Sequence, residues 1–168
     1  KYMRIIKKIV ILCVITMLFL TTNMIWESNV KATTIYPIRN VDLYSKGEIL
    51  GFQYKGVPIG VQFVVYKKDG IEYPAYCLDR TKMGVDTNGG YSVYIEQAVS
   101  DPAIWRAVNY GYPFYTAAQL GCQSDGEAFA ATKMAVYDTM YHYDWNDFKA
   151  TNKTGERIIN AAKKISNK

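Results

Sequence analysis

The chain has 168 residues and a formal net charge of +5, but most of that charge belongs to its first 32 residues. Five of the 20 basic residues and one of the 15 acidic residues lie there, so residues 33–168 keep 15 basic and 14 acidic residues, a net charge of +1. This balance excludes any charge-based argument for nucleic-acid binding. The remaining 136 residues suffice for one domain with a buried core.

Residues 1–32 have the pattern of a signal peptide. A basic start, residues 1–8, precedes an uncharged run over 9–20, and Val30-Lys31-Ala32 offers small residues where a signal peptidase cleaves. A retained anchor helix needs about 20 apolar residues, and polar residues interrupt this run from Thr21 onward. We therefore expect a secreted protein whose only contact with the membrane is through the signal peptide.

Both ends of the sequence suggest a fragment. It opens on Lys1, with Met3 as a plausible true start, and it stops at Lys168 inside a predicted helix. We therefore divide the chain into a signal peptide over 1–32 and a domain over 33–168 that is incomplete at its C-terminus.

The first half of this domain has the alternation of β-strands. Residues 48–54 and 59–66 are β-branched and aromatic runs, separated by the turn Lys55-Gly56-Val57-Pro58. Asp69-Gly70 is a strong hairpin signal because the pair readily adopts positive φ. The return strand is predicted over 71–78, which places Cys77 near its far end.

The second half has helical periodicity. One helix is predicted to start at Pro102, after a cap at Ser100 or Asp101, and to end before Gly111. A loop over 111–126 leads to a second helix, which runs from Asp125 or Glu127 to Tyr141, and a third helix begins near Thr154 with Asn152 as its cap. Apolar faces are expected at Ile104, Trp105, Ala107 and Val108 in the first helix, at Phe129, Val136, Tyr137 and Met140 in the second, and at Ile158, Ile159, Ala162 and Ile165 in the third; Ala128, Ala130, Ala131 and Ala135 allow close packing of the second helix. Strands followed by helices predict an α+β fold, in which a β-rich sheet or barrel-like part precedes a helical part.

Two cysteines remain after Cys13 leaves with the signal peptide. A disulfide between Cys77 and Cys122 is the simplest expectation for an oxidising compartment. Cys122, however, lies in a polar loop, and a domain of this size does not need one bridge for stability. A disulfide, a reactive thiol and an acyl-carrying thiol therefore all stay open for Cys77.

Three short motifs resemble a known family. In order, they are Tyr76-Cys77-Leu78-Asp79, Val108-Asn109-Tyr110-Gly111-Tyr112-Pro113 and Ala130-Ala131-Thr132-Lys133-Met134-Ala135-Val136-Tyr137. Together they resemble the thioester domain of Gram-positive surface adhesins, over about residues 40 to 165. Each motif alone has little specificity, but the ordered set behind a signal peptide is fairly specific.

This resemblance implies an α+β thioester-domain fold and a role for Cys77 as the sulfur of an internal Cys–Gln thioester. It also implies a secreted or wall-attached adhesin that binds an amine of a host surface or matrix protein once, without enzymatic turnover and without a cofactor or metal. The motifs place Tyr76, Asp79, Thr132, Lys133 and Tyr137 as supporting residues. Lys133 and Tyr137 stand where the family has Gln and Trp, and the acyl-donor Gln of the family lies further downstream, so we expect it beyond Lys168.

Lys133 has two interpretations. Its ammonium could favour the thiolate of Cys77, or it could be a helical lysine whose head lies in solvent. Other amide candidates carry no clear signal, and two of them, Gln53 and Gln62, are expected on strand faces that point to solvent; the set is Gln53, Gln62, Gln97, Gln119 and Gln123.

Two other functions stay open. The domain could be a non-reactive binding module, or it could be a secreted cysteine hydrolase or transglutaminase-like enzyme that uses Cys77, His142 and Asp144. The acidic cluster near His142 matches no known metal-ligand spacing; its members are Asp138, His142, Asp144 and Asp147.

Overall fold

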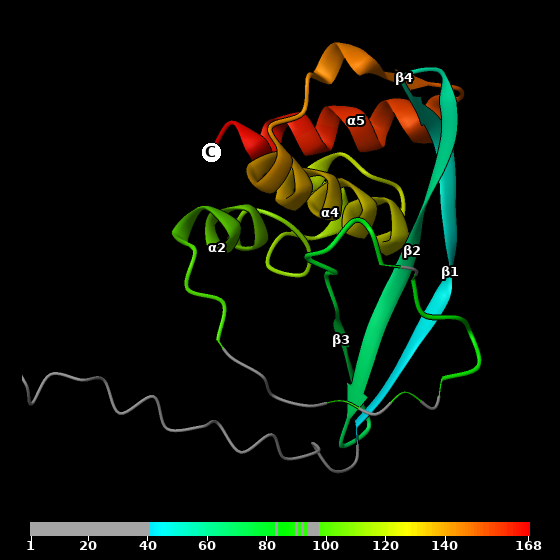
Figure 1. The fold of residues 1–168 in the computed structure, drawn as a ribbon, viewed down its shortest axis with the longest axis vertical. Helices are drawn as coiled ribbons and strands as arrows, with labels where there is room; N and C mark the ends of the chain where they lie inside the picture. Colours follow the sequence, from blue (N-terminus) through cyan, green and yellow to red (C-terminus); the bar gives the residue numbers. More distant parts are fainter. Residues whose placement is uncertain (1–40, 83, 90, 92, 94–97) are drawn as a thin grey trace, which may run out of the picture. The chain divides into compact units, whose positions relative to one another are not determined.

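The computed structural model describes residues 41–168, except residues 83, 90, 92 and 94–97. The predicted signal peptide lies outside the described residues and stays a prediction. Four strands form one antiparallel sheet in the order β3-β2-β1-β4 (Figure 1). They span β1 Val41–Tyr54, β2 Val57–Lys68, β3 Ile71–Pro74 and β4 Phe148–Ala150.

Two tight turns connect the first three strands. Lys55 and Gly56 have φ values of 51° and 81°, and Asp69 and Gly70 have 51° and 85°, as a two-residue hairpin turn requires. The second turn was predicted correctly. The first is shorter than the predicted four residues, because Val57 and Pro58 already pair with β1.

The return strand is shorter than the predicted 71–78. β3 ends at Pro74, and the Ala75 amide donates one more hydrogen bond to the Val64 carbonyl at 2.9 Å. The chain then leaves the sheet because Tyr76 turns inward, where its ring stacks on Phe129 at 4.7 Å between ring centroids. Cys77 therefore lies in a loop and not at the end of a strand.

The predicted helices form, each with a side-chain cap. They are α2 Pro102–Asn109, α4 Asp125–Tyr141 and α5 Lys153–Ser166, capped by Asp101, Ser124 and Asn152. Sequence reasoning missed the short helix α3 Ala117–Leu120, the 3₁₀ turn Trp145–Asp147 and β4. The α+β prediction is confirmed, with β4 as a late strand that joins the free edge of β1.

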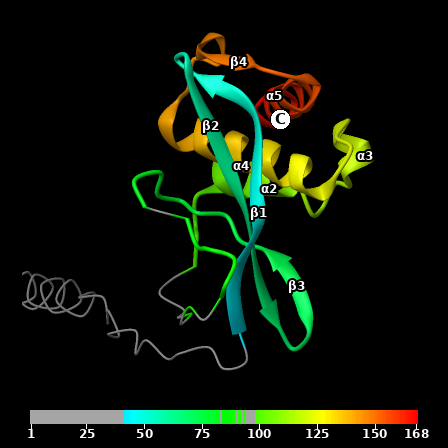
Figure 2. The same ribbon diagram turned by 90° about the vertical axis from the view of Figure 1, so that its right-hand side faces the viewer.

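The core forms where α4 and α5 pack on one end of the β1–β2 hairpin, while β3 pairs with its other end (Figures 1 and 2). The alanines of α4 are fully buried, as predicted; they are Ala128, Ala130, Ala131 and Ala135. In α2, Ile104 and Ala107 are buried as predicted, but Trp105 is 48% exposed, because its ring NH reaches back to the Val99 carbonyl at 2.6 Å. The buried face of α2 is therefore narrower than its apolar pattern indicates.

Candidate functional site around Cys77

Cys77 carries a half-buried thiol in the loop between β3 and α2. Its Sγ donates a hydrogen bond to the Asp79 carbonyl at 3.0 Å. The Asp79 carboxylate accepts from the amide and hydroxyl of Thr81 at 2.8 and 2.6 Å, and these bonds lower the pKa of Asp79. Asp79 thus shapes the loop around the thiol through its own backbone and carboxylate.

Two residues one turn apart on α4 face Cys77. Burial raises the pKa of the Tyr137 phenol, and its interaction with Cys77 acts in the same direction. The Lys133 Nζ lies 5.6 Å from the centroid of the Tyr137 ring. Burial lowers the pKa of the Lys133 ammonium, although the charge of Cys77 acts in the opposite direction. Lys133 is half-buried and lines a cavity beside α4, so its head does not lie free in solvent; that it favours the Cys77 thiolate stays a prediction.

Thr132 supports the site from behind. The side chain is fully buried; its hydroxyl donates to the Ala128 carbonyl at 2.8 Å and accepts from the Tyr112 amide at 2.8 Å. The Tyr112 carbonyl in turn accepts from the Tyr76 hydroxyl at 2.5 Å. A continuous set of hydrogen bonds therefore runs from α4 through Tyr112 to the residue that precedes Cys77.

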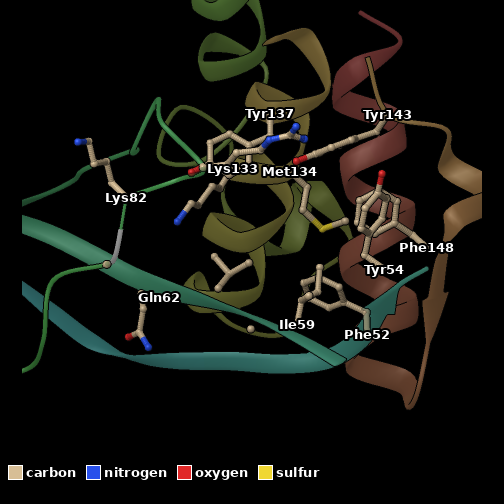
Figure 3. Close-up of a pocket in the computed structure, with 14 residues that line it drawn as sticks. Phe52, Tyr54, Ile59, Gln62, Lys82, Lys133, Met134, Tyr137, Tyr143 and Phe148 are labelled. Carbon is tan, nitrogen blue, oxygen red and sulfur yellow. The ribbon is translucent and has the colours of Figure 1, made fainter. Parts of the chain in front are cut away.

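A cavity of about 370 Å³ opens beside this site, between α4, β2 and the loop after Cys77 (Figure 3). Lys133 and Met134 extend into it from α4, and Tyr54 and Phe148 lie at its far end. Gln62 also lines it and accepts from the Ser45 hydroxyl at 2.6 Å, so the prediction that Gln62 points to solvent was wrong. The sequence motifs also missed the basic lining residues Arg80 and Lys82, although both follow Cys77 closely in the chain.

The other candidate residues lie apart from this arrangement. Cys77 and Cys122 are both free thiols, and burial raises the pKa of Cys122 to about 11. His142 ends α4 with an exposed side chain and a φ of 50°, and the Asp144 carboxylate accepts from the Asn146 amide at 2.9 Å. In the part of the chain that the structure describes, no hydrogen bond joins Cys77 to His142, and no group of three or more His, Cys, Asp or Glu side chains could hold a metal ion.

The chain belongs to the thioester-domain family, because the sequence model of that family, "Thioester domain", matches residues 74–168. Among solved structures, the Bacillus anthracis TIE protein has a similar fold, with a TM-score of 0.58 and 21% sequence identity. The alignment covers 76% of this chain and 23% of that one, so this chain spans less than a quarter of that protein. No curated protein matches the chain.

Replacing the Lys133 ammonium should stabilise the fold. Because the folded pKa of Lys133 is lowered, the unfolded chain holds this proton more tightly, and the fold is penalised at pH values below the folded pKa. We expect Lys133→Met to raise the free energy of unfolding at pH 7 by about 1 kcal/mol. In urea titrations, the difference from the unmodified protein should shrink as the pH rises toward 10, and a difference that stays constant with pH would contradict the lowered pKa of Lys133.

Proposed function

We propose that this domain attaches a bacterial surface protein covalently to an amine of a host protein, through a thioester carried by Cys77. The observation that carries the proposal is the Cys77 thiol itself, which is half-buried, bonded to the Asp79 carbonyl, and close to Tyr137 and Lys133 of the cavity wall. Membership of the thioester-domain family supplies the class of chemistry.

The chemistry has two balanced steps. In the first, the Cys77 thiolate attacks the side-chain carboxamide of a glutamine, a C–S bond forms, and ammonia leaves with the proton from the thiol. In the second, an amine of the partner attacks the thioester carbonyl, an amide bond forms, and the Cys77 thiol is released. The product amide is stable, so each molecule reacts once and does not turn over as an enzyme does.

We place the acyl-donor glutamine downstream of Lys168. Two of the described glutamines are already engaged: Gln119 closes the capping box of α3 through its side-chain oxygen, and the side-chain oxygen of Gln62 accepts from Ser45. Secretion by a signal peptide over residues 1–32 and attachment to the cell wall complete the proposal. Among the described residues, no helix is both long enough and apolar enough to cross a bilayer.

Intact-mass spectrometry of the complete protein tests the proposal. We expect a mass one ammonia below that of the sequence, and treatment with methylamine should convert it to a mass one methylamine heavier. Cys77→Ala should show neither the deficit nor the adduct. A full-length mass with a free, alkylatable Cys77 would leave only a non-covalent binding module.

Matched variants separate this chemistry from the hydrolase alternative. His142→Ala should keep both the mass deficit and the methylamine adduct, because the exposed His142 ends α4 and takes no part in the proposed steps. Loss of the adduct in His142→Ala, with the fold intact by circular dichroism, would instead support a Cys–His enzyme.

A further inference from the structure

The cavity beside Cys77 has an open strand edge along one side. β3 pairs with β2 only from Val65 to Lys68, and the Ala75 amide extends this contact to Val64. Residues 59–62 of β2 line the cavity, and on the edge away from β1 the described residues give them no strand partner. An unpaired strand edge in a cavity can bind an extended peptide through backbone hydrogen bonds.

The cavity is also positively charged. Arg80, Lys82 and Lys133 line it, and no lining residue is acidic. None of these three side chains takes part in an ion pair within the described part of the chain. The nearest carboxylate is that of Asp79, whose pKa Lys82 helps to lower. Asp79 does not line the cavity, and its Oδ1 already accepts both hydrogen bonds from Thr81.

The positive groups come from α4 and from the loop that follows Cys77, which does not itself line the cavity. The Arg80 guanidinium carbon lies 4.3 Å from the centroid of the Tyr141 ring, and the Tyr141 hydroxyl meets the backbone of Leu78 and Arg80 at 3.3 Å. These contacts hold Arg80, three residues after Cys77, against α4. At the far end the walls are aromatic, with Tyr54 and Phe148 at 4.8 Å between ring centroids.

We infer that this cavity binds an extended acidic segment of the partner protein, so that the lysine accepted by the thioester is flanked by Asp or Glu. The inference rests on the proposed function and specifies its substrate. The partner's backbone lies along residues 59–62 of β2, its carboxylates pair with Arg80 and Lys82, and its amine reaches the acyl group on Cys77. Charge complementarity selects this occupant, because an apolar or basic segment would bring no negative charge to a cavity that has three basic and no acidic lining residues.

A peptide competition on the complete protein tests the inference. Once a methylamine adduct has shown that the thioester is present, the rate of adduct formation is measured by intact mass with two peptides. Both have one lysine; in one it is flanked by four glutamates, and in the other by four glutamines. At low ionic strength we expect the glutamate peptide to react about tenfold faster, and at 0.5 M NaCl we expect the ratio to fall toward one.

Charge variants locate the effect. In Arg80→Gln/Lys82→Gln the ratio of the two rates should fall to about two or less. Lys67→Gln/Lys68→Gln removes the same charge from exposed positions at the β2–β3 turn, outside the cavity, and should keep the ratio.

Three results would overturn the inference, and they are distinguishable. Equal rates for the two peptides, with methylamine still reacting, would reject the acidic acceptor and leave the proposed function intact. Absence of the mass deficit and of the methylamine adduct would reject the proposed function itself. Loss of the mass deficit in Arg80→Gln/Lys82→Gln would mean that the cavity instead receives the acyl-donor segment of this chain.

Discussion

Glu127→Ala is expected to lower the free energy of unfolding by about 3 kcal/mol, because it removes one partner of a buried ion pair. Glu127 is 6% exposed, and its two carboxylate oxygens accept from the Arg157 guanidinium at 2.6 and 2.8 Å. One of them also accepts from the Gln123 amide at 2.9 Å. The pair joins α4 to α5, so its loss should weaken the packing of the helix that carries Lys133 and Tyr137. Equilibrium unfolding in urea measures the change.

The chain offers a matched control for this pair. Glu72 and Lys46 form an equally direct contact at 2.7 Å, but their side chains are 38% and 42% exposed. Water and salt screen such a pair, so Glu72→Ala should cost much less than Glu127→Ala. If both substitutions lowered the free energy of unfolding equally, burial would not set the strength of the Glu127–Arg157 contact.

The same variant has a predicted pH dependence. Hydrogen bonds from Arg157 lower the pKa of Glu127 below its usual value of 4.5. The folded state therefore holds the proton less tightly than the unfolded state, and the stabilisation is present above pH 4.5 and lost as the pH falls. The gap between the unmodified protein and Glu127→Ala should accordingly narrow below pH 4.5, and a constant gap would contradict this.

Sequence reasoning succeeded where a local rule decided the structure. The Asp69-Gly70 turn, the Asn152 cap and the end of α4 at Tyr141 each depend on residues within one turn of the chain, and the start of α2 was narrowed to a cap at Ser100 or Asp101, of which Asp101 is the cap. It failed where distant contacts decided the structure. β4 forms because Phe148 pairs with Tyr54, and β3 stops because Tyr76 stacks on Phe129, 53 positions further along the chain.

The candidate site shows the same division. The motifs brought Cys77, Lys133 and Tyr137 forward as a group, and the structure places these three side chains together. The cavity could not be predicted, because its walls come from β1, β2, α4, β4 and two loops. Its basic side combines Lys133 with Arg80 and Lys82, which are about 50 positions away, and only the fold brings them together.

Gly111→Ala is expected to lower the free energy of unfolding by about 2–3 kcal/mol, through overpacking against Thr132. A Cβ at position 111 would lie 2.4 Å from Thr132 Cγ2 and 2.5 Å from Thr132 Oγ1. Thr132 cannot move away easily, because it is fully buried and its hydroxyl is bonded to Ala128 and Tyr112. The displacement should pass through Tyr112 to Tyr76, so reactivity of Cys77 toward an alkylating reagent should also change.

A double-mutant cycle with Thr132→Ala shows whether Thr132 transmits this effect. Thr132→Ala alone should be destabilising, because the Tyr112 amide loses its acceptor. It also removes the two closest of the three atoms that crowd position 111 and leaves only the Cβ of residue 132, at 2.9 Å, so adding Gly111→Ala to it should cost less than about 2–3 kcal/mol. If the two changes are additive in urea unfolding, Gly111 is required for some other reason. A third result would be that the two substitutions are non-additive in the free energy of unfolding while neither changes the reactivity of Cys77. In that case the hydrogen bonds from Thr132 through Tyr112 and Tyr76 stabilise the fold without positioning the thiol.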